Sequence, residues 1–338
     1  MGRRVVAVAG VAAAAAVLGS TVTVASAEPV DPTAGAVDSP RSVGARLDRV
    51  EQITDTRTAL FVESTAMGRI VQVQVLHPAN ETPRPSLYLL DGVGAGEESD
   101  YSESTWTLET DAVDFFADKP VNVVLPVGGT GAYYTDWLRP DSGLGQPQWE
   151  TFLTEELPRI IDSEMHGNGA NAVAGVSMGA MGAGNLITRH PDLYRGLTAF
   201  SGCLDTTDPI ARDSVRSTVA YKGGDAANMW GFDSDPAWTA HNPAANAEAL
   251  RGKQIYVSTG NGLPGRYETG GVADAPRIAI GGPLEAAANY CTQSFERKMN
   301  AMQIPATIVY HDQGTHSWPY WQDEMRRAWP DIARALEI

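Results

Sequence analysis

One serine in the sequence stands in a setting that favours nucleophilic chemistry. The run Gly175-Val176-Ser177-Met178-Gly179 fits the pattern G-x-S-x-G. A short apolar run precedes it, and a segment rich in glycine and alanine follows it. A nucleophile elbow needs this arrangement, because the serine occupies a strained strand-to-helix turn and its neighbours must be small. The alternative is a glycine-rich turn with a surface serine, and we predict that Ser177 is the nucleophile.

A serine hydroxyl attacks efficiently only when a histidine accepts its proton. In enzymes built on this elbow the acid and the histidine follow the serine, with the histidine after the last strand. The histidines that follow the serine are His190, His241, His311 and His316. His316 lies in a loop just after an expected strand at 306–310, whereas His311 continues that strand. We therefore predict that His316 is the base and that His311 is structural.

The acid that orients the histidine is left open by the chain order. Glu268, Asp274 and Glu285 all follow an expected strand at 254–258 and precede His316. Order alone does not choose among them.

Neither a metal nor a cofactor is predicted. His311 and His316 have a spacing that could hold a metal, but no third ligand is evident beside them. The chain has only two cysteines, Cys203 and Cys291, which cannot form a four-cysteine zinc site.

The elements expected around these residues alternate between strands and helices. The expected strands are 58–62, 70–76, 86–90, 121–126, 171–174, 197–200, 254–258 and 306–310, and the expected helices are 149–161, 178–190 and 285–302. The first two strands read as antiparallel, and the later short apolar runs read as buried strands of a mostly parallel sheet. This order predicts a doubly wound α/β domain flanked by helices, with a helical cap insertion over Asp205–Leu250.

The N-terminus carries an export signal. Arg3 and Arg4 precede an apolar stretch at 5–18, which ends in the cleavage pattern Ala25-Ser26-Ala27. We predict a signal peptide over 1–27, a flexible leader over 28–48 and a single domain over 49–338. The alternative is an uncleaved membrane anchor. In an oxidising compartment an even pair of cysteines favours a disulfide, so we predict a Cys203–Cys291 bridge.

Charge limits the classes of partner. The 338 residues carry 25 Lys plus Arg against 41 Asp plus Glu, a formal net charge of −16. A nucleic-acid binder needs clustered positive charge, so we expect no nucleic-acid partner.

The chain resembles the antigen 85-type mycolyltransferases, in the esterase D branch of the α/β-hydrolases. The segments that carry the resemblance stand in one order from about residue 60 to the C-terminus. They are Met67-Gly68-Arg69, Tyr88-Leu89-Leu90-Asp91-Gly92, Pro126-Val127-Gly128-Gly129, Tyr134-Thr135-Asp136-Trp137, Trp149-Glu150-Thr151-Phe152-Leu153-Thr154, Ser177-Met178, Met229-Trp230-Gly231, Ser234-Asp235-Pro236-Ala237-Trp238, Gly260-Asn261-Gly262 and Gly314-Thr315-His316-Ser317-Trp318-Pro319-Tyr320-Trp321.

The resemblance implies an α/β-hydrolase fold and selects Glu285 as the acid, so that Glu268 and Asp274 would be surface residues. It also implies that the backbone amides of Val93 and Met178 form the oxyanion hole, a placement that physical reasoning favours too.

Further residues fall at family positions near the sugar or the catalytic cleft. They are Asp91, Asp205, Ser317 and Trp318. The chain departs from the family at Gly94, where the family usually has an arginine close to the bound sugar.

The function implied is a secreted or cell-envelope acyltransferase. It would move a mycolyl chain from trehalose monomycolate to trehalose or a cell-wall sugar through an acyl-enzyme on Ser177, acting as a monomer at the cell-envelope surface. The cap aromatics Trp230, Phe232 and Trp238, with Met229, could bury the lipid chain or simply pack the core. The rival functions are a secreted carboxylic ester hydrolase, in which water replaces the sugar, and a surface adhesion or binding protein.

Overall fold

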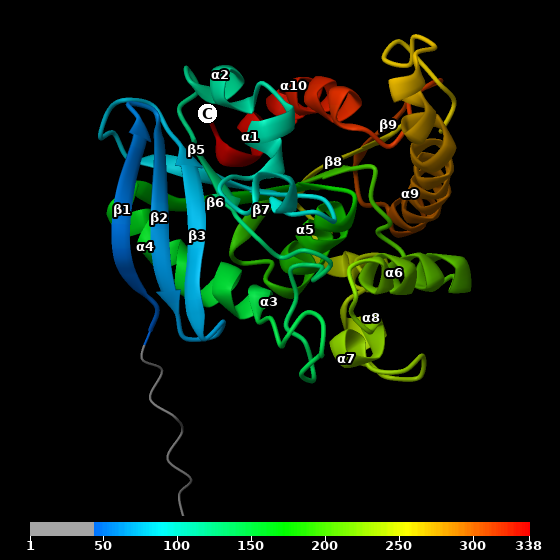
Figure 1. The fold of residues 1–338 in the computed structure, drawn as a ribbon, viewed down its shortest axis with the longest axis horizontal. Coiled ribbons are helices and arrows are strands. Elements are labelled where there is room, and N and C mark those ends of the chain that lie inside the picture. The colour runs from blue at the N-terminus through cyan, green and yellow to red at the C-terminus, as the bar shows by residue number, and fades with distance from the viewer. Residues whose placement is uncertain (1–43) are drawn as a thin grey trace, which may run out of the picture. The chain divides into compact units, whose positions relative to one another are not determined.

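The computed structural model describes residues 44–338. Within them nine strands form one sheet in the order β1-β2-β3-β5-β4-β6-β7-β8-β9 (Figure 1). The strands are β1 (Arg46–Thr54), β2 (Arg57–Ser64), β3 (Arg69–Leu76), β4 (Arg84–Leu90), β5 (Asn122–Pro126), β6 (Gly167–Val176), β7 (Tyr194–Phe200), β8 (Gln254–Thr259) and β9 (Thr307–Tyr310).

The sheet is mostly parallel, as predicted. Strands β1, β2 and β3 pair antiparallel with one another, and β3 pairs antiparallel with β5. Every later pairing, from β5–β4 to β8–β9, is parallel. Every residue of β4 and β5 is buried, because helices cover both faces of a parallel sheet. Because β4, β6, β7 and β8 run parallel, their carboxyl ends lie at the same edge of the sheet.

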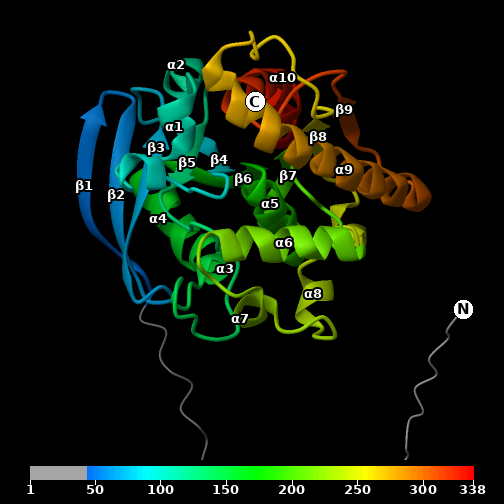
Figure 2. The same cartoon turned by 45° about the vertical axis from the view of Figure 1, so that its right-hand side comes forward.

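Two layers of helices cover the sheet (Figures 1 and 2). The helices are α1 (Thr105–Glu109), α2 (Ala112–Phe116), α3 (Trp149–Thr151), α4 (Leu157–Glu164), α5 (Met178–Arg189), α6 (Pro209–Tyr221), α7 (Ala226–Trp230), α8 (Ala237–Ala240), α9 (Gly282–Met302) and α10 (Trp318–Leu336). Side chains of α1, α2 and α10 pack into the core on one face. Those of α3, α4, α5 and α9 pack into the core on the other.

The structure also shows elements that the sequence did not predict. Strand β1 begins at Arg46, three residues before the predicted start of the domain. Helices α1, α2 and α10 are likewise additional. The signal peptide and the leader up to residue 43 lie outside the described residues. Among residues 44–338, no helix has the length and apolar character needed to cross a bilayer.

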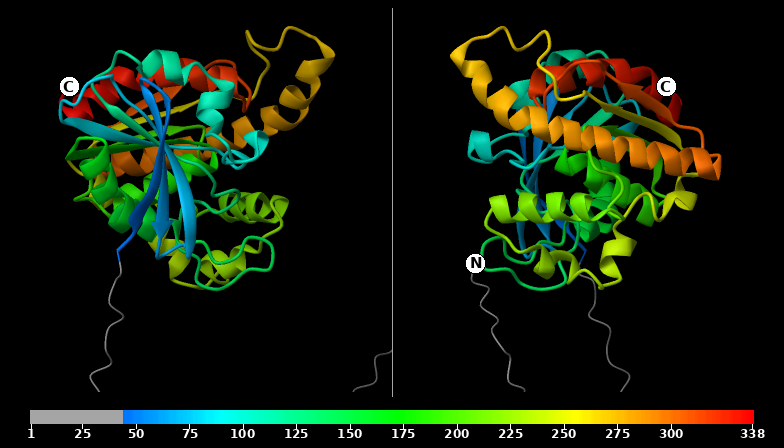
Figure 3. Two further views of the ribbon diagram at one scale, coloured as in Figure 1. Left: turned by 60° about the vertical axis from the view of Figure 1, so that its left-hand side comes forward. Right: turned by 90° about the vertical axis from the view of Figure 1, so that its right-hand side faces the viewer.

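The predicted helical insertion is present as α6, α7 and α8, which Figure 3 shows at one end of the domain. Its aromatic residues do not form an open lipid pocket. Met229, Trp230 and Trp238 are at most 1% exposed and belong to the main core. Phe232 is 72% exposed. Core packing is therefore the role of the three buried residues.

Candidate active site

Ser177 stands on the strained turn that the motif predicted. It joins β6 to α5 with φ 55° and ψ −118°, a conformation that a residue with a Cβ rarely adopts. A Cβ at Gly175 would overlap the backbone of Gly179, and one at Gly179 would overlap the carbonyl of Asp91. The small residues of the motif are therefore required by close backbone contact. The Ser177 amide donates to the Phe200 carbonyl at 2.8 Å, which fixes the turn on β7.

Three predicted side chains lie in one hydrogen-bonded series. His316 Nε2 lies 2.8 Å from Ser177 Oγ, and His316 Nδ1 lies 2.8 Å from Glu285 Oε2. A carboxylate can only accept, so Nδ1 carries the hydrogen and Nε2 is left to accept from the serine hydroxyl. The structure therefore brings together Ser177, His316 and Glu285, from the β6–α5 turn, the β9–α10 loop and the first turn of α9.

Glu285 is held in its charged form by its surroundings. Burial raises the pKa of this carboxyl, which is 2% exposed, but hydrogen bonds from His316, Ser201 and the Gly260 amide bring the pKa below its ordinary value. Glu285 Oε1 accepts from Ser201 Oγ at 2.7 Å, from Thr259 Oγ1 at 3.1 Å and from the Gly260 amide at 2.6 Å.

Ser201, Thr259 and Gly260 were not predicted as site residues. Ser201 directly follows β7, Thr259 is the last residue of β8, and Gly260 follows it. Polar residues at the carboxyl ends of parallel strands are the signal that could have found them, because sites of α/β proteins gather there.

The loop that carries His316 is fixed on two sides. The amide of His316 donates to the Gly281 carbonyl at 3.0 Å, next to the start of α9. The preceding residue, Thr315, donates through Oγ1 to Glu268 Oε1 at 2.7 Å. The Trp321 ring meets the imidazole edge-on at 4.8 Å between centroids. These contacts hold the loop where the imidazole faces Ser177.

The two predicted oxyanion donors are placed beside the nucleophile. Met178 is the first residue of α5, and the first amides of a helix have no partner within the helix. Val93 follows Gly92, whose Cβ position would lie 3.8 Å from Ser177 Cβ. The Val93 carbonyl accepts from the Gly131 amide at 3.1 Å, which holds this loop in place.

The predicted sugar contacts divide into two groups. Asp91 and Asp205 are buried, at 0% and 9% exposure, and bind the protein itself. Asp91 accepts from Ser104 Oγ at 2.8 Å and from two amides at the start of α1. Asp205 accepts from Ser294 Oγ of α9 at 2.7 Å. The structure therefore gives both carboxylates a local structural role.

Ser317 and Trp318 stay close to the histidine. Ser317 is 7% exposed and lies 3.2 Å, oxygen to oxygen, from Thr315. Trp318 is half-buried, and its ring packs edge-on against that of Trp106 at 5.2 Å.

The expectation that Glu268 and Asp274 lie on the surface is wrong. Glu268 is half-buried and accepts from Thr315, from Tyr320 Oη at 2.6 Å and from the Gly265 amide at 2.8 Å. Asp274 is 6% exposed and caps the turn before it. Both acids order the segment that leads into α9.

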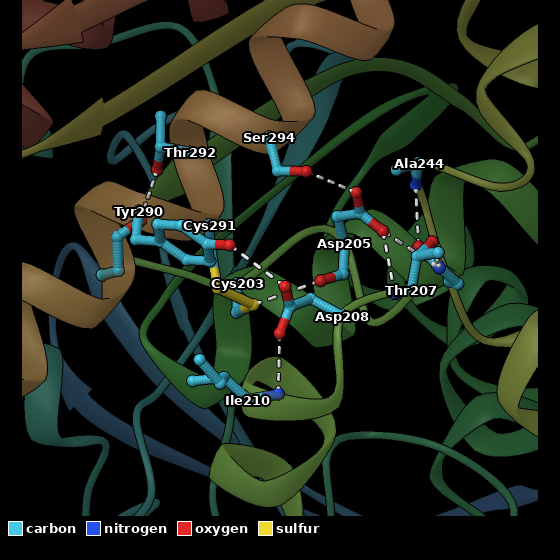
Figure 4. Close-up of a disulfide and its surroundings, with 12 residues drawn as sticks. Cys203, Asp205, Thr207, Asp208, Ile210, Ala244, Tyr290, Cys291, Thr292 and Ser294 are labelled. Atoms are coloured by element: carbon cyan, nitrogen blue, oxygen red, sulfur yellow. Dashed lines mark hydrogen bonds between the residues drawn. A yellow bond between two sulfur atoms is a disulfide. The ribbon is translucent and has the colours of Figure 1, made fainter. Parts of the chain in front are cut away.

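The predicted disulfide is confirmed. Cys203 and Cys291 are bonded, with their Cα atoms 4.9 Å apart (Figure 4). Cys203 lies just after β7, and Cys291 lies on α9 six residues beyond Glu285. Two hydrogen bonds join the same segments, from Ser294 to Asp205 and from Tyr290 Oη to Asp208 at 3.0 Å. The bridge therefore ties the helix that carries the acid to the sheet.

Comparison with known proteins identifies the family. The family model described as "Putative esterase" matches residues 64–332. A relative from Mycobacterium leprae, "Diacylglycerol acyltransferase/mycolyltransferase Ag85A", is 34% identical over 286 residues, covering 82% of each chain. The chain belongs to the antigen 85 mycolyltransferases. It is therefore an acyltransferase with an esterase fold. The Ag85A protein of Mycobacterium tuberculosis (strain ATCC 25618 / H37Rv) is 33% identical and covers 82% of this chain and 80% of its own length.

Solved structures agree with this assignment. Mycobacterium tuberculosis MPT51 (FbpC1) superposes with a TM-score of 0.69 at 25% identity, over 82% of this chain and 97% of that chain. An S-formylglutathione hydrolase from Agrobacterium tumefaciens superposes with a TM-score of 0.58 at 16% identity, over 86% of this chain and 99% of that chain. At that identity the second likeness shows the α/β-hydrolase fold alone.

Proposed function

We propose that this antigen 85 family member is a secreted serine acyltransferase that moves a mycolyl chain from trehalose monomycolate to trehalose or to a cell-wall sugar. The observation that carries the proposal is the series Glu285–His316–Ser177, in which each link is 2.8 Å long. The names of the relatives, which include mycolyltransferase, suggest the acyl group, and the family resemblance of the sequence suggests trehalose.

The first step forms the acyl-enzyme. Ser177 Oγ attacks the ester carbonyl carbon of the donor while His316 Nε2 takes the hydroxyl proton. Glu285 stabilises the imidazolium that results, since it lies against Nδ1. The amides of Val93 and Met178 receive the charge that develops on the carbonyl oxygen. The intermediate collapses when the C–O bond to trehalose breaks, and the leaving oxygen takes the proton from His316.

The second step reverses the roles. A hydroxyl of the acceptor sugar gives its proton to His316 Nε2 and attacks the acyl carbonyl. The bond to Ser177 Oγ then breaks, and the serine recovers its proton from His316. Water in place of the sugar would give hydrolysis through the same groups.

Export and site of action are part of the proposal. The pattern over 1–27 supports a signal peptide cleaved after Ala27, followed by a leader and one catalytic domain, and a confirmed disulfide suits an oxidising compartment. The proposed donor is a lipid of the cell envelope, so we place the enzyme there, acting as a monomer.

The test is an acyl-transfer assay with purified protein, trehalose monomycolate and labelled trehalose. Entry of the label into glycolipid supports transfer. Release of free fatty acid with no labelled glycolipid would overturn transferase activity in favour of a carboxylic ester hydrolase. Ser177→Ala should abolish both products, and a variant that keeps the full rate would remove Ser177 from the mechanism.

A further inference from the structure

A carboxylate outside the triad occupies a vacant side-chain position on the oxyanion loop. Gly94 is buried, and a Cβ built on it would overlap the carboxylate of Glu98, with Glu98 Cδ only 2.8 Å away. The φ of Gly94 is not among the positive values, so its backbone would accept other residues. The absence of a side chain at Gly94 therefore leaves space that the Glu98 carboxylate fills.

The glycine whose side-chain position this carboxylate fills lies on the loop that faces the nucleophile. Gly94 is two residues from Gly92, so their Cα atoms are at most about 7 Å apart. Gly92 in turn faces Ser177, with 3.8 Å between its Cβ position and Ser177 Cβ. The charge of Glu98 also contributes to raising the pKa of the buried Asp91.

A second chain of contacts runs from Glu98 to the histidine loop. Glu98 Oε2 accepts from Thr105 Oγ1 at 3.3 Å, at the start of α1. The next residue, Trp106, packs against Trp318, which is two residues beyond His316. Glu98 thus lies on the segment that joins the oxyanion loop to the histidine side of the cleft.

The neighbouring acid makes a useful contrast. Glu97 is also exposed, but its carboxylate forms an ion pair with Lys222. Within residues 44–338 Glu98 forms no ion pair, and its one side-chain hydrogen bond is long, at 3.3 Å. An exposed carboxylate with unused acceptor positions can take hydrogen bonds from the hydroxyl groups of a sugar.

We propose that Glu98 is a specificity-determining residue that binds hydroxyl groups of the acceptor sugar and disfavours acceptors that carry a negative charge. The inference rests on the proposed function, because it assigns a contact within the acceptor position of that reaction. The site is therefore expected to bind neutral polyols, such as unmodified sugars. An anionic sugar would meet the fixed charge of Glu98 and the acidic field of the whole chain.

The test measures sugar binding and needs no catalysis. Ser177→Ala protein is titrated calorimetrically with trehalose and with trehalose 6-phosphate. We expect trehalose to bind more tightly than its phosphate. Adding Glu98→Gln should weaken the binding of trehalose about tenfold, which is the loss expected for hydrogen bonds to a charged acceptor. It should also reduce the difference in affinity between trehalose and its phosphate. Gly94→Ala, whose methyl group would displace the carboxylate, should weaken trehalose in the same direction.

Glu97→Gln in the same background is the matched control, because it removes an equal charge from the same turn. We expect it to leave both affinities within about twofold. Failure of trehalose to bind, or a Glu98→Gln protein with both affinities unchanged, overturns the assignment. The transfer assay is separate: a protein that binds trehalose through Glu98 but transfers no acyl group would overturn the proposed function and leave the assignment of Glu98 standing.

Discussion

At the residue scale, the orientation of the Glu285 carboxylate is set by the groups that occupy its two oxygens. Oε1 accepts from Ser201, Thr259 and the Gly260 amide, which leaves Oε2 for His316. Because three donors fix one oxygen, the other cannot turn away from the imidazole. We infer that this division keeps His316 in the tautomer that can accept the serine proton.

Replacing Glu285 by glutamine should therefore impair the chemical step. A glutamine presents an oxygen or an amide to Nδ1 and cannot stabilise an imidazolium as a carboxylate does. We expect Glu285→Gln to lower kcat by about 10³- to 10⁴-fold with little change in KM. Steady-state kinetics on the donor ester measures both.

Glu268→Gln is the control for that variant. Its carboxylate holds Thr315 and Tyr320 but does not touch the imidazole. A loss in kcat of about tenfold or less is expected, from a less well held loop. Equal losses for the two variants would contradict the distinction between an acid that orients the histidine and an acid that braces its loop.

Asp91 predicts a pH dependence of stability. Burial raises the pKa of Asp91 from its ordinary value of 3.8 to about 7. Hydrogen bonds from Thr105, Ser104 and Trp106 lower the pKa, but by less than burial raises it. Between about pH 4 and about pH 7 Asp91 is protonated in the folded chain and ionised in the unfolded chain. The contribution of Asp91 to the free energy of unfolding therefore falls as the pH rises from about 4 to about 7. The loss is at most about 4 kcal/mol.

Urea unfolding at pH 5 and pH 8 tests this expectation, with Asp91→Asn as the comparison because asparagine stays neutral. Relative to the variant, the wild-type protein should lose free energy of unfolding at pH 8. The same difference between the two proteins at both pH values would show that Asp91 does not titrate in this range.

At the scale of elements, the disulfide and α9 form one unit. The bridge joins residues 88 apart in the sequence. It stabilises the folded protein because it lowers the conformational entropy of the unfolded chain, and the effect grows with the length of the closed loop. Removing both sulfurs with Cys203→Ser and Cys291→Ser should lower the free energy of unfolding by about 2–5 kcal/mol. Urea titration measures the change. Reductant should destabilise the wild-type protein by a similar amount and leave the double variant unaffected. A wild-type protein insensitive to full reduction would rule out a stabilising role for the bridge.

Strand β1 was missed from the sequence for a physical reason. Most of β1 is exposed, so its run Arg46–Thr54 lacks the alternation of apolar and polar residues that marks a half-buried strand. Its assignment depends on pairing with β2, which is a tertiary contact. The buried strands β4 to β8, by contrast, could be predicted, because a strand that is buried on both faces consists mostly of apolar residues.

The site shows the same division. Ser177 and His316 could be predicted, because the elbow constrains neighbouring residue types and the chain order limits the choice of base. The choice of Glu285 over Glu268 required the family resemblance, since each acid has the right order and only the fold decides which one reaches the imidazole. For Asp91 the family resemblance implies a position near the sugar or the catalytic cleft, and this stays a prediction. The structure adds that its carboxylate accepts from two α1 amides, a contact that the sequence did not reveal.

At the scale of the whole molecule, the acidic charge and the export signal are linked. Cleavage after Ala27 would leave 311 of the 338 residues. Because the removed segment contains two arginines and no acid, the formal net charge would change from −16 to −18. A chain of this charge repels anionic polymers at low salt, and its proposed substrates, a neutral sugar and its lipid ester, need no basic surface.

The proposed export predicts a defined mature N-terminus. Expression of the full chain in a bacterium with a working export pathway should give an extracellular or envelope protein that begins at Glu28, as N-terminal sequencing or intact mass would show. The small residues at the −3 and −1 positions fit the signal peptidase, so a bulky charged residue in Ala27→Arg should block cleavage and leave a longer, membrane-retained product. A wild-type protein that keeps residues 1–27 would instead support the uncleaved anchor, and with it a membrane-tethered enzyme whose catalytic domain is unchanged.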